Sequence, residues 1–203
     1  MSDPCRIGVF GGTFDPIHNT HLAIARAARQ QADLDIVLFV VSAQPPHKHG
    51  ATFATAEDRL ALVEAAVADV PGMRASRIEL DRVGPSYTAD TLETLHREYP
   101  QTELFLIIGM DSLIDLPKWR TPDRILARAH LLVVPRPGDA EIPALVQGRH
   151  TMLDFPKSDV SSTDIRARIE SGDPCADVLP PSVAALIQQR GLYRECAEHS
   201  TRG

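Results

Sequence analysis

Lysine is scarce in this chain, which is acidic overall. The 203 residues hold 21 basic side chains and carry a formal net charge of −6. Proteins that coat nucleic acid or acidic membranes present a broad basic surface, so this balance argues against both kinds of partner. The lysines are Lys48, Lys118 and Lys157.

Cysteines and long apolar runs are also few. Cys5, Cys175 and Cys196 are widely separated, which excludes a disulfide framework and a CxxC metal site. The longest apolar runs, Ile36–Val41 and Leu104–Ile108, are far too short to span a membrane. The N-terminal segment has no signal-peptide core, so we expect a cytoplasmic protein. With 43% hydrophobic and 24% charged residues, the composition is that of a globular protein with its own core.

Strand-like and helix-like segments alternate along the chain. Apolar, β-branched runs predict strands at 6–10, 36–41, 73–80, 104–108, 131–134 and 151–155. Helical periodicity predicts helices at 17–31, 56–69, 88–99, 121–129, 161–169 and from Pro180 to a C-terminal glycine, Gly191. This order predicts an α/β fold, a Rossmann-like doubly wound parallel sheet with helices on both faces. We expect a single domain over 1–203, with a small helical C-terminal subdomain at 158–191, a loop at 135–148 and a frayed tail at 196–203.

The segment after the first predicted strand carries the strongest functional signal. In doubly wound sheets, ligands bind at the carboxyl ends of the strands. Gly11 and Gly12 let backbone N–H groups approach an anion closely, and the next helix N-terminus adds positive potential. His18 and His21 share one face of that helix. Because neither GxGxxG nor a P-loop Gly-Lys-Ser/Thr is present, the pattern predicts a phosphate site built from imidazole and backbone donors.

Further candidates follow later predicted elements, and each has a simpler structural interpretation. Lys48 comes after a stiff Pro-Pro pair and suits phosphate, but a surface lysine would also fit. Thr88 is expected to cap a helix whose first N–H groups could receive a carboxylate. Asp111 could accept hydrogen bonds from ribose hydroxyls, or simply cap a short helix. The segment 161–166 places hydroxyls and Arg166 at a helix start, a second anion site or an ordinary cap.

These motifs together resemble a known family. Gly11 to His21 resembles the GGTFDPIHxGH signature of bacterial nicotinate-nucleotide adenylyltransferases, members of the HxGH nucleotidyltransferase superfamily. Thr20 departs from it, because the family usually has glycine there. Four more segments follow in the family's order: PPHK at 45–48, RxGxSYTxDTL at 82–92, GxD at 109–111 and SSTxIR at 161–166. The resemblance covers about residues 6–194.

The resemblance implies transfer of an adenylyl group from ATP to nicotinate mononucleotide, which yields deamido-NAD and pyrophosphate in NAD biosynthesis. The attacking phosphate is already ionised, so catalysis is expected to consist of positioning and charge stabilisation. Mg²⁺ is expected to arrive with ATP, without a metal site made by the protein alone. The implied partners are the two small substrates, with no nucleic acid or membrane, and a homo-oligomer is left open. The implied catalytic residues are His18, His21, Lys48 and Arg166.

The resemblance also divides the predicted site between the two substrates. Trp119 would stack on the pyridine ring, although packing against neighbouring basic side chains is an alternative. Backbone N–H groups near Thr88 and Arg120 would receive the nicotinate carboxylate. The implied ATP-binding residues are Gly11, Gly12, Thr13, Phe14, His18, His21, Gly109, Asp111, Ser162, Thr163 and Arg166. The implied mononucleotide-binding residues are Thr13, Asp15, His47, Lys48, Tyr87, Thr88, Trp119 and Arg120.

Three other functions compete with this one. The phosphate motif alone would permit another adenylyl acceptor such as phosphopantetheine, although the SYTxDTL segment and Trp119 argue against it. Thr20 is the one feature that favours a nucleotide-binding regulator without catalysis. A zinc site is the third, but it lacks a carboxylate or cysteine in ligand spacing and leaves the two glycines unexplained. Its ligands would be His18, His21, His47 and His49.

Overall fold

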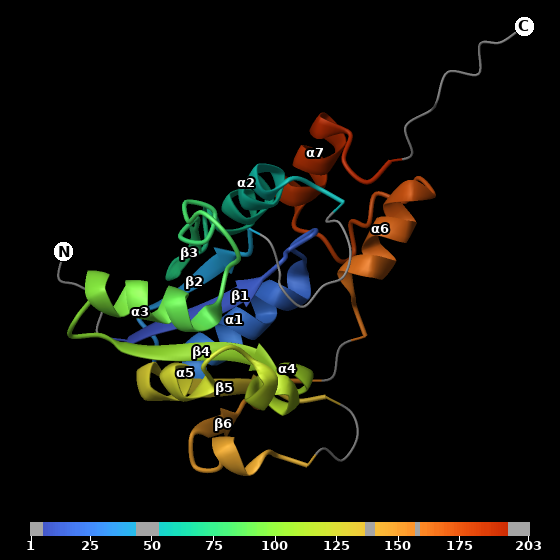
Figure 1. Ribbon diagram of the computed structural model, residues 1–203. Coiled ribbons are helices and arrows are strands. Elements are labelled where there is room, and N and C mark those ends of the chain that lie inside the picture. The colour runs from blue at the N-terminus through green and yellow to red at the C-terminus, as the bar shows by residue number, and fades with distance from the viewer. Residues whose placement is uncertain (1–5, 44–52, 137–140, 157–158, 195–203) are drawn as a thin grey trace, which may run out of the picture.

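The computed structural model describes residues 6–43, 53–136, 141–156 and 159–194 (Figure 1). Six parallel strands form one sheet in the order β3-β2-β1-β4-β5-β6. This confirms the Rossmann-like doubly wound sheet. The strands are β1 Arg6–Gly12, β2 Ile36–Val41, β3 Met73–Ser76, β4 Glu103–Gly109, β5 Ala129–Val134 and β6 His150–Met152.

Helices cover both faces of the sheet (Figure 1). The core residues of α1, α2, α6 and α7 pack on one face, and those of α3, α4 and α5 pack on the other. The α-helices are α1 Asn19–Gln31, α2 Ala56–Val67, α3 Thr88–Glu98, α4 Met110–Asp115, α5 Pro122–Arg128, α6 Ser162–Glu170 and α7 Pro181–Arg190, and the short 3₁₀ turns are η1 Leu116–Lys118 and η2 Ala144–Val146.

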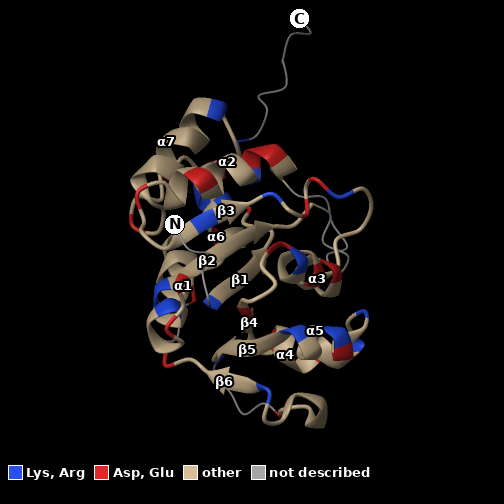
Figure 2. Ribbon diagram, turned by 90° about the vertical axis from the view of Figure 1, so that its left-hand side faces the viewer, with Lys and Arg blue, Asp and Glu red and all other residues tan. Residues whose placement is uncertain are grey.

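The central strands are apolar on both sides because both of their faces are covered. In β4, Leu104 and Leu106 pack toward α3 and α5, whereas Phe105 and Ile107 pack toward α1 on the other face. Charges lie on the outer helices, and α3 and α5 carry them side by side (Figure 2). There Arg128 pairs with Glu93 at 3.0 Å. Among the described residues, no helix is long and apolar enough to cross a membrane.

Several strands and helices begin or end at other residues than the sequence predicts. The strand predicted at 73–80 ends at Ser76, because the next residues turn, with the Leu80 N–H bonded to the Arg77 carbonyl at 2.8 Å. The strand predicted at 151–155 spans His150–Met152 instead. The helix predicted from 17 begins at Asn19, because His18 is extended at φ −145° and serves as its N-cap. The α4 helix follows β4 directly and places Asp111 in its first turn rather than at its cap.

Candidate active site

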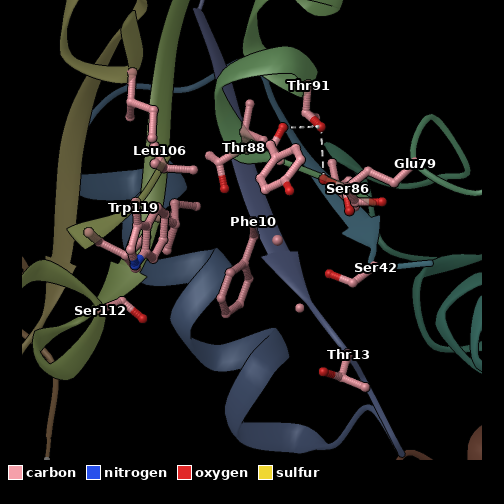
Figure 3. Close-up of a pocket in the computed structure, with 18 of the residues that line it drawn as sticks. Phe10, Thr13, Ser42, Glu79, Ser86, Thr88, Thr91, Leu106, Ser112 and Trp119 are labelled. Atoms are coloured by element: carbon pink, nitrogen blue, oxygen red, sulfur yellow. Dashed lines mark hydrogen bonds between the residues drawn. The ribbon is translucent and has the colours of Figure 1, made fainter. Parts of the chain in front are cut away.

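The order in which strands are added to the sheet reverses beside β1, and a cavity opens there. Strand β1 pairs with β2 on one side and with β4 on the other, so the connections leave in opposite directions and create a crevice at the strand ends. A cavity of about 270 Å³ lies at this point (Figure 3). It gathers eight of the predicted site residues: Gly11, Gly12, Thr13, Tyr87, Thr88, Gly109, Trp119 and Arg120.

Residues 13–18, which we call the phosphate turn, fold back over the end of β1. Phe14 adopts the left-handed conformation at φ 50° and is buried. A Cβ atom at Gly12 would lie 2.8 Å from the Phe14 ring, so this fold of the turn requires glycine at position 12. The Phe14 ring also meets the His21 ring edge-on, at 5.1 Å between centroids. The turn therefore sets the position of an imidazole as well as of backbone N–H groups.

His18 and His21 lie together at the start of α1, as the sequence predicts. Their ring centroids are 3.8 Å apart, and the backbone N–H of His18 donates to His21 Nδ1 at 3.3 Å. Burial lowers the pKa of His18 to about 4, so this imidazole is neutral at pH 7. Its buried Nδ1 has no hydrogen-bond partner within the described part of the chain. His18 can thus offer a neutral imidazole to an anion, with the His21 ring beside it.

A second cavity of about 300 Å³ lies on the histidine side of the turn. It is lined by His18, Thr20 and His21 on α1 and by Ser161 and Ser162 at the start of α6. The first cavity meets the turn at Thr13 and the second at His18, so one short segment contributes to both. This arrangement suits a reaction that joins two phosphate-bearing molecules.

Helix α6 is docked onto the same turn. Ser162 Oγ donates to the Pro16 carbonyl at 3.0 Å, and Arg166 Nη1 donates to the Asp15 carbonyl at 2.8 Å. The Arg166 guanidinium lies 4.2 Å from the centre of the Phe53 ring. Its second terminal nitrogen contacts the exposed Thr163 at 3.3 Å. A fixed positive charge therefore stands beside the phosphate turn, where the sequence predicts one.

The Asp15 side chain is hydrogen-bonded to other parts of the chain. Its buried carboxylate accepts hydrogen bonds from Phe53 N at 2.9 Å, Ala54 N at 3.2 Å and Tyr193 Oη at 2.8 Å. It does not appear among the residues that line either of the two cavities in the described chain. Its predicted contact with the mononucleotide stays a prediction.

The far end of the first cavity is aromatic and basic. Trp119 and Leu106 lie on one side of it, and Glu79, Ser86 and Thr91 on the other (Figure 3). The Arg120 guanidinium stacks 4.4 Å from the centre of the Tyr87 ring. Tyr87, not Thr88, is the N-cap of α3, so the predicted cap was wrong by one residue. Tyr87 makes no side-chain capping bond, and the first turn of α3 begins at the cavity.

The remaining predicted residues lie elsewhere. Asp111 is exposed and paired with Arg136, and it does not line the first cavity. His47, Lys48 and His49 lie outside the described residues, as do Cys5 and Cys196, whereas Cys175 is a buried free thiol. Within the described ranges, no three His, Cys, Asp or Glu residues come together as a metal cluster would require.

Two buried charged side chains at the site were not predicted from the sequence. Glu79 lines the cavity and accepts a hydrogen bond from Thr91 Oγ1 at 2.8 Å, and burial raises the pKa of its carboxyl group. Arg59 is 1% exposed and donates to the Thr13 carbonyl at 2.7 Å. Arg59 could have been noticed, because with Leu62, Val63 and Ala66 it falls on the apolar stripe of its helix. For Glu79 the sequence holds no comparable signal.

The buried His18 makes stability depend on pH. Its pKa is about 4 when folded and 6.5 in its ordinary state, so the unfolded chain binds the extra proton first. The resulting stability is present above pH 6.5 and is lost as the pH falls toward 4. We expect His18 to account for about 2 kcal/mol of lost unfolding free energy between pH 7 and pH 5. Urea unfolding of the wild type and of His18→Asn at both pH values measures this, and equal losses in the two proteins would contradict it.

Comparisons with known proteins define the class first. A family model described as cytidylyltransferase-like matches residues 9–168, which places the chain among nucleotidyltransferases of that fold. A relative from Roseiflexus sp., named probable nicotinate-nucleotide adenylyltransferase, is 46% identical over 93% of this chain and 98% of its own length. A relative of the same name from Leifsonia xyli is 42% identical over 95% of this chain and 96% of its own. The chain belongs to the nicotinate-nucleotide adenylyltransferase family.

Solved structures agree on the fold. A putative nicotinate-nucleotide adenylyltransferase from Vibrio parahaemolyticus superimposes with a TM-score of 0.69 at 22% identity, covering 95% of this chain and 97% of that one. The Plasmodium falciparum nicotinic acid mononucleotide adenylyltransferase complexed with NaAD superimposes with a TM-score of 0.76 at 16% identity, covering 93% and 97%. At these identities the likeness concerns the architecture.

Proposed function

We propose that this protein transfers the adenylyl group of ATP to nicotinate mononucleotide and releases deamido-NAD and pyrophosphate. The observation that carries the proposal is the phosphate turn, which contributes to an aromatic cavity at Thr13 and to a histidine-lined cavity at His18. Two nucleotides bound in these cavities would present their phosphates to one another across the turn. Family membership supports the same reaction.

Catalysis in this site would rest on positioning and charge. The nucleophile is the 5′-phosphate of the mononucleotide, which attacks the α-phosphorus of ATP while the bond to pyrophosphate breaks. Because that phosphate is already ionised, no side chain needs to remove a proton. His18 and His21 would donate hydrogen bonds to the phosphate oxygens of ATP, and Arg166 would stabilise the charge that builds up. Lys48, outside the described residues, stays a predicted contact of the attacking phosphate.

The first cavity would hold the nicotinate mononucleotide. The Trp119 indole supplies a face on which a pyridine ring can stack, and the start of α3 at Thr88 supplies N–H groups for a carboxylate. The Arg120 guanidinium on Tyr87 adds positive charge at the same end. These features favour the acid over the amide, whose neutral group gains less from them.

Mg²⁺ would enter as its complex with ATP. The Asp15 carboxylate beside the turn already accepts three hydrogen bonds, and Asp111 is paired with Arg136. ATP oxygens and water would therefore supply most of its ligands, and the ion would neutralise phosphate charge. The cytoplasmic location stays a prediction from the sequence.

A coupled pyrophosphate assay tests the proposal. With ATP and Mg²⁺, we expect steady pyrophosphate release with nicotinate mononucleotide and a kcat/KM at least about tenfold lower with the amide, since a buried carboxylate contact is lost. Phosphopantetheine in the same assay serves as the control acceptor. Equal or higher kcat/KM with the amide would contradict the acid preference. Absence of turnover with either mononucleotide would contradict the reaction itself and favour a regulator.

A further inference from the structure

The Asp15 carboxylate joins the phosphate turn to two distant parts of the chain. Its Oδ2 accepts from the Phe53 N–H, just before α2, at 2.9 Å. Its Oδ1 accepts from the hydroxyl of Tyr193, which is 178 residues away in sequence, at 2.8 Å. A carboxylate held by several donors is fixed in orientation, so the turn that carries it is fixed as well.

Tyr193 is itself held in place by α7. That helix ends at Gly191, which adopts the left-handed conformation at φ 63°, and Leu192 N donates to the Ile187 carbonyl at 3.1 Å. Helix α7 is anchored on α2 through Ser182 Oγ, which donates to the Ala65 carbonyl at 2.7 Å, and through Arg190, which pairs with Asp58 at 2.7 Å. Burial, reinforced by the charge of Asp15, raises the pKa of Tyr193, so its hydroxyl stays a donor at neutral pH.

Backbone strain occurs at Tyr193 itself and at Phe14, the residue before Asp15. Phe14, which precedes Asp15, has φ 50°, and Tyr193 has φ 63°, and both values are unusual for residues with side chains. Such conformations persist only where the surrounding structure fixes them. The Phe14 ring lies edge-on to the His21 ring, with 5.1 Å between the ring centroids. A shift of Asp15 would therefore be transmitted through Phe14 to an imidazole of the site.

We infer that Tyr193 is a positioning residue for adenylyl transfer, whose hydroxyl fixes the phosphate turn through Asp15 and so sets the place of His21. The inference rests on the proposed function. It gives the C-terminal helix a part in catalysis, and it gives the Asp15 carboxylate a role that needs no contact with substrate. Arg166, which donates to the Asp15 carbonyl at 2.8 Å, holds the same residue from α6.

The variant Tyr193→Phe tests this, because it removes one hydroxyl and keeps the ring. At 25 °C, with folding verified by circular dichroism, we expect kcat to fall about tenfold, since small misplacements of reacting groups are costly. KM for either substrate should change less than about twofold, because Tyr193 does not touch substrate. The matched control is Tyr99→Phe, at the end of α3, which should keep the wild-type kcat. A merely structural role would lower the melting midpoint and leave kcat at 25 °C unchanged, which would overturn the inference.

A double-mutant cycle with Asp15→Ala, which removes the acceptor of the Tyr193 hydroxyl, identifies the route. If Tyr193 acts through Asp15, then Tyr193→Phe lowers kcat in the wild-type background and has no further effect in Asp15→Ala. An undiminished effect in that background would overturn the inference. Should Asp15→Ala fail to fold, the kcat of Tyr193→Phe decides alone. A wild-type protein that releases no pyrophosphate would contradict the proposed function, whereas an active wild type matched by Tyr193→Phe contradicts the inference alone.

Discussion

Replacing His18 or His21 by alanine is expected to lower kcat by about 10²-fold or more while the protein stays folded. In the proposed reaction, each imidazole would donate to phosphate oxygens whose charge is rearranged in the transition state. Their loss would remove transition-state stabilisation that water cannot replace in the same geometry. Steady-state pyrophosphate release measures kcat, and circular dichroism at 25 °C verifies the fold.

The two effects should not multiply. The two rings pack against each other with centroids 3.8 Å apart, so removing one side chain is expected to displace the other. We therefore expect the double variant to lose less than the product of the two single losses. His96→Ala, in the last turn of α3, is the matched control and should retain wild-type kcat. Near-wild-type activity in both single variants would refute the assignment of the phosphate site.

Much of the fold was predictable because its signals are local. The run at 36–41 is apolar throughout, and strand β2 has those bounds because a strand covered on both faces needs no polar positions. The run at 73–80 misled because Ile78 and Leu80 are apolar but belong to a turn. Apolar character alone does not distinguish a strand end from a packed turn.

The site residues likewise fall into those that local sequence predicts and those that only the folded chain brings together. Gly12, His18 and Thr88 could be predicted, because strand ends and helix starts converge at one edge of the sheet. Asp15, Arg59 and Tyr193 meet through contacts between segments far apart in sequence, which no local pattern encodes. Asp15 was predicted for its motif, yet the structure uses its carboxylate to hold backbone N–H groups and a hydroxyl.

Replacing Arg59 by methionine is expected to lower the free energy of unfolding by about 2–4 kcal/mol. The Arg59 guanidinium is 1% exposed, donates to the Thr13 carbonyl at 2.7 Å, and reaches the Ala43 carbonyl at 3.5 Å. Methionine fills a similar volume but leaves these carbonyl groups without their donor. Burial lowers the pKa of Arg59, and the nearby negative charge of the buried Asp15 carboxylate partly offsets this. The substitution also removes this positive charge from the neighbourhood of Asp15. Urea unfolding at pH 7 measures the loss.

Two comparisons separate this effect from the general cost of replacing an arginine. Arg74→Met changes an exposed side chain on β3 and should alter the unfolding free energy by less than about 0.5 kcal/mol. Arg59→Lys keeps the charge, but its single ammonium group replaces a guanidinium whose two terminal nitrogens reach two carbonyl groups. Its free energy of unfolding should therefore lie between those of Arg59→Met and the wild type. A loss in Arg59→Met no larger than that in Arg74→Met would show that the buried guanidinium does not hold the turn. Because Thr13 lines the first cavity and begins the phosphate turn, the loss of stability should be accompanied by a fall in kcat, and Arg59→Lys should recover part of both.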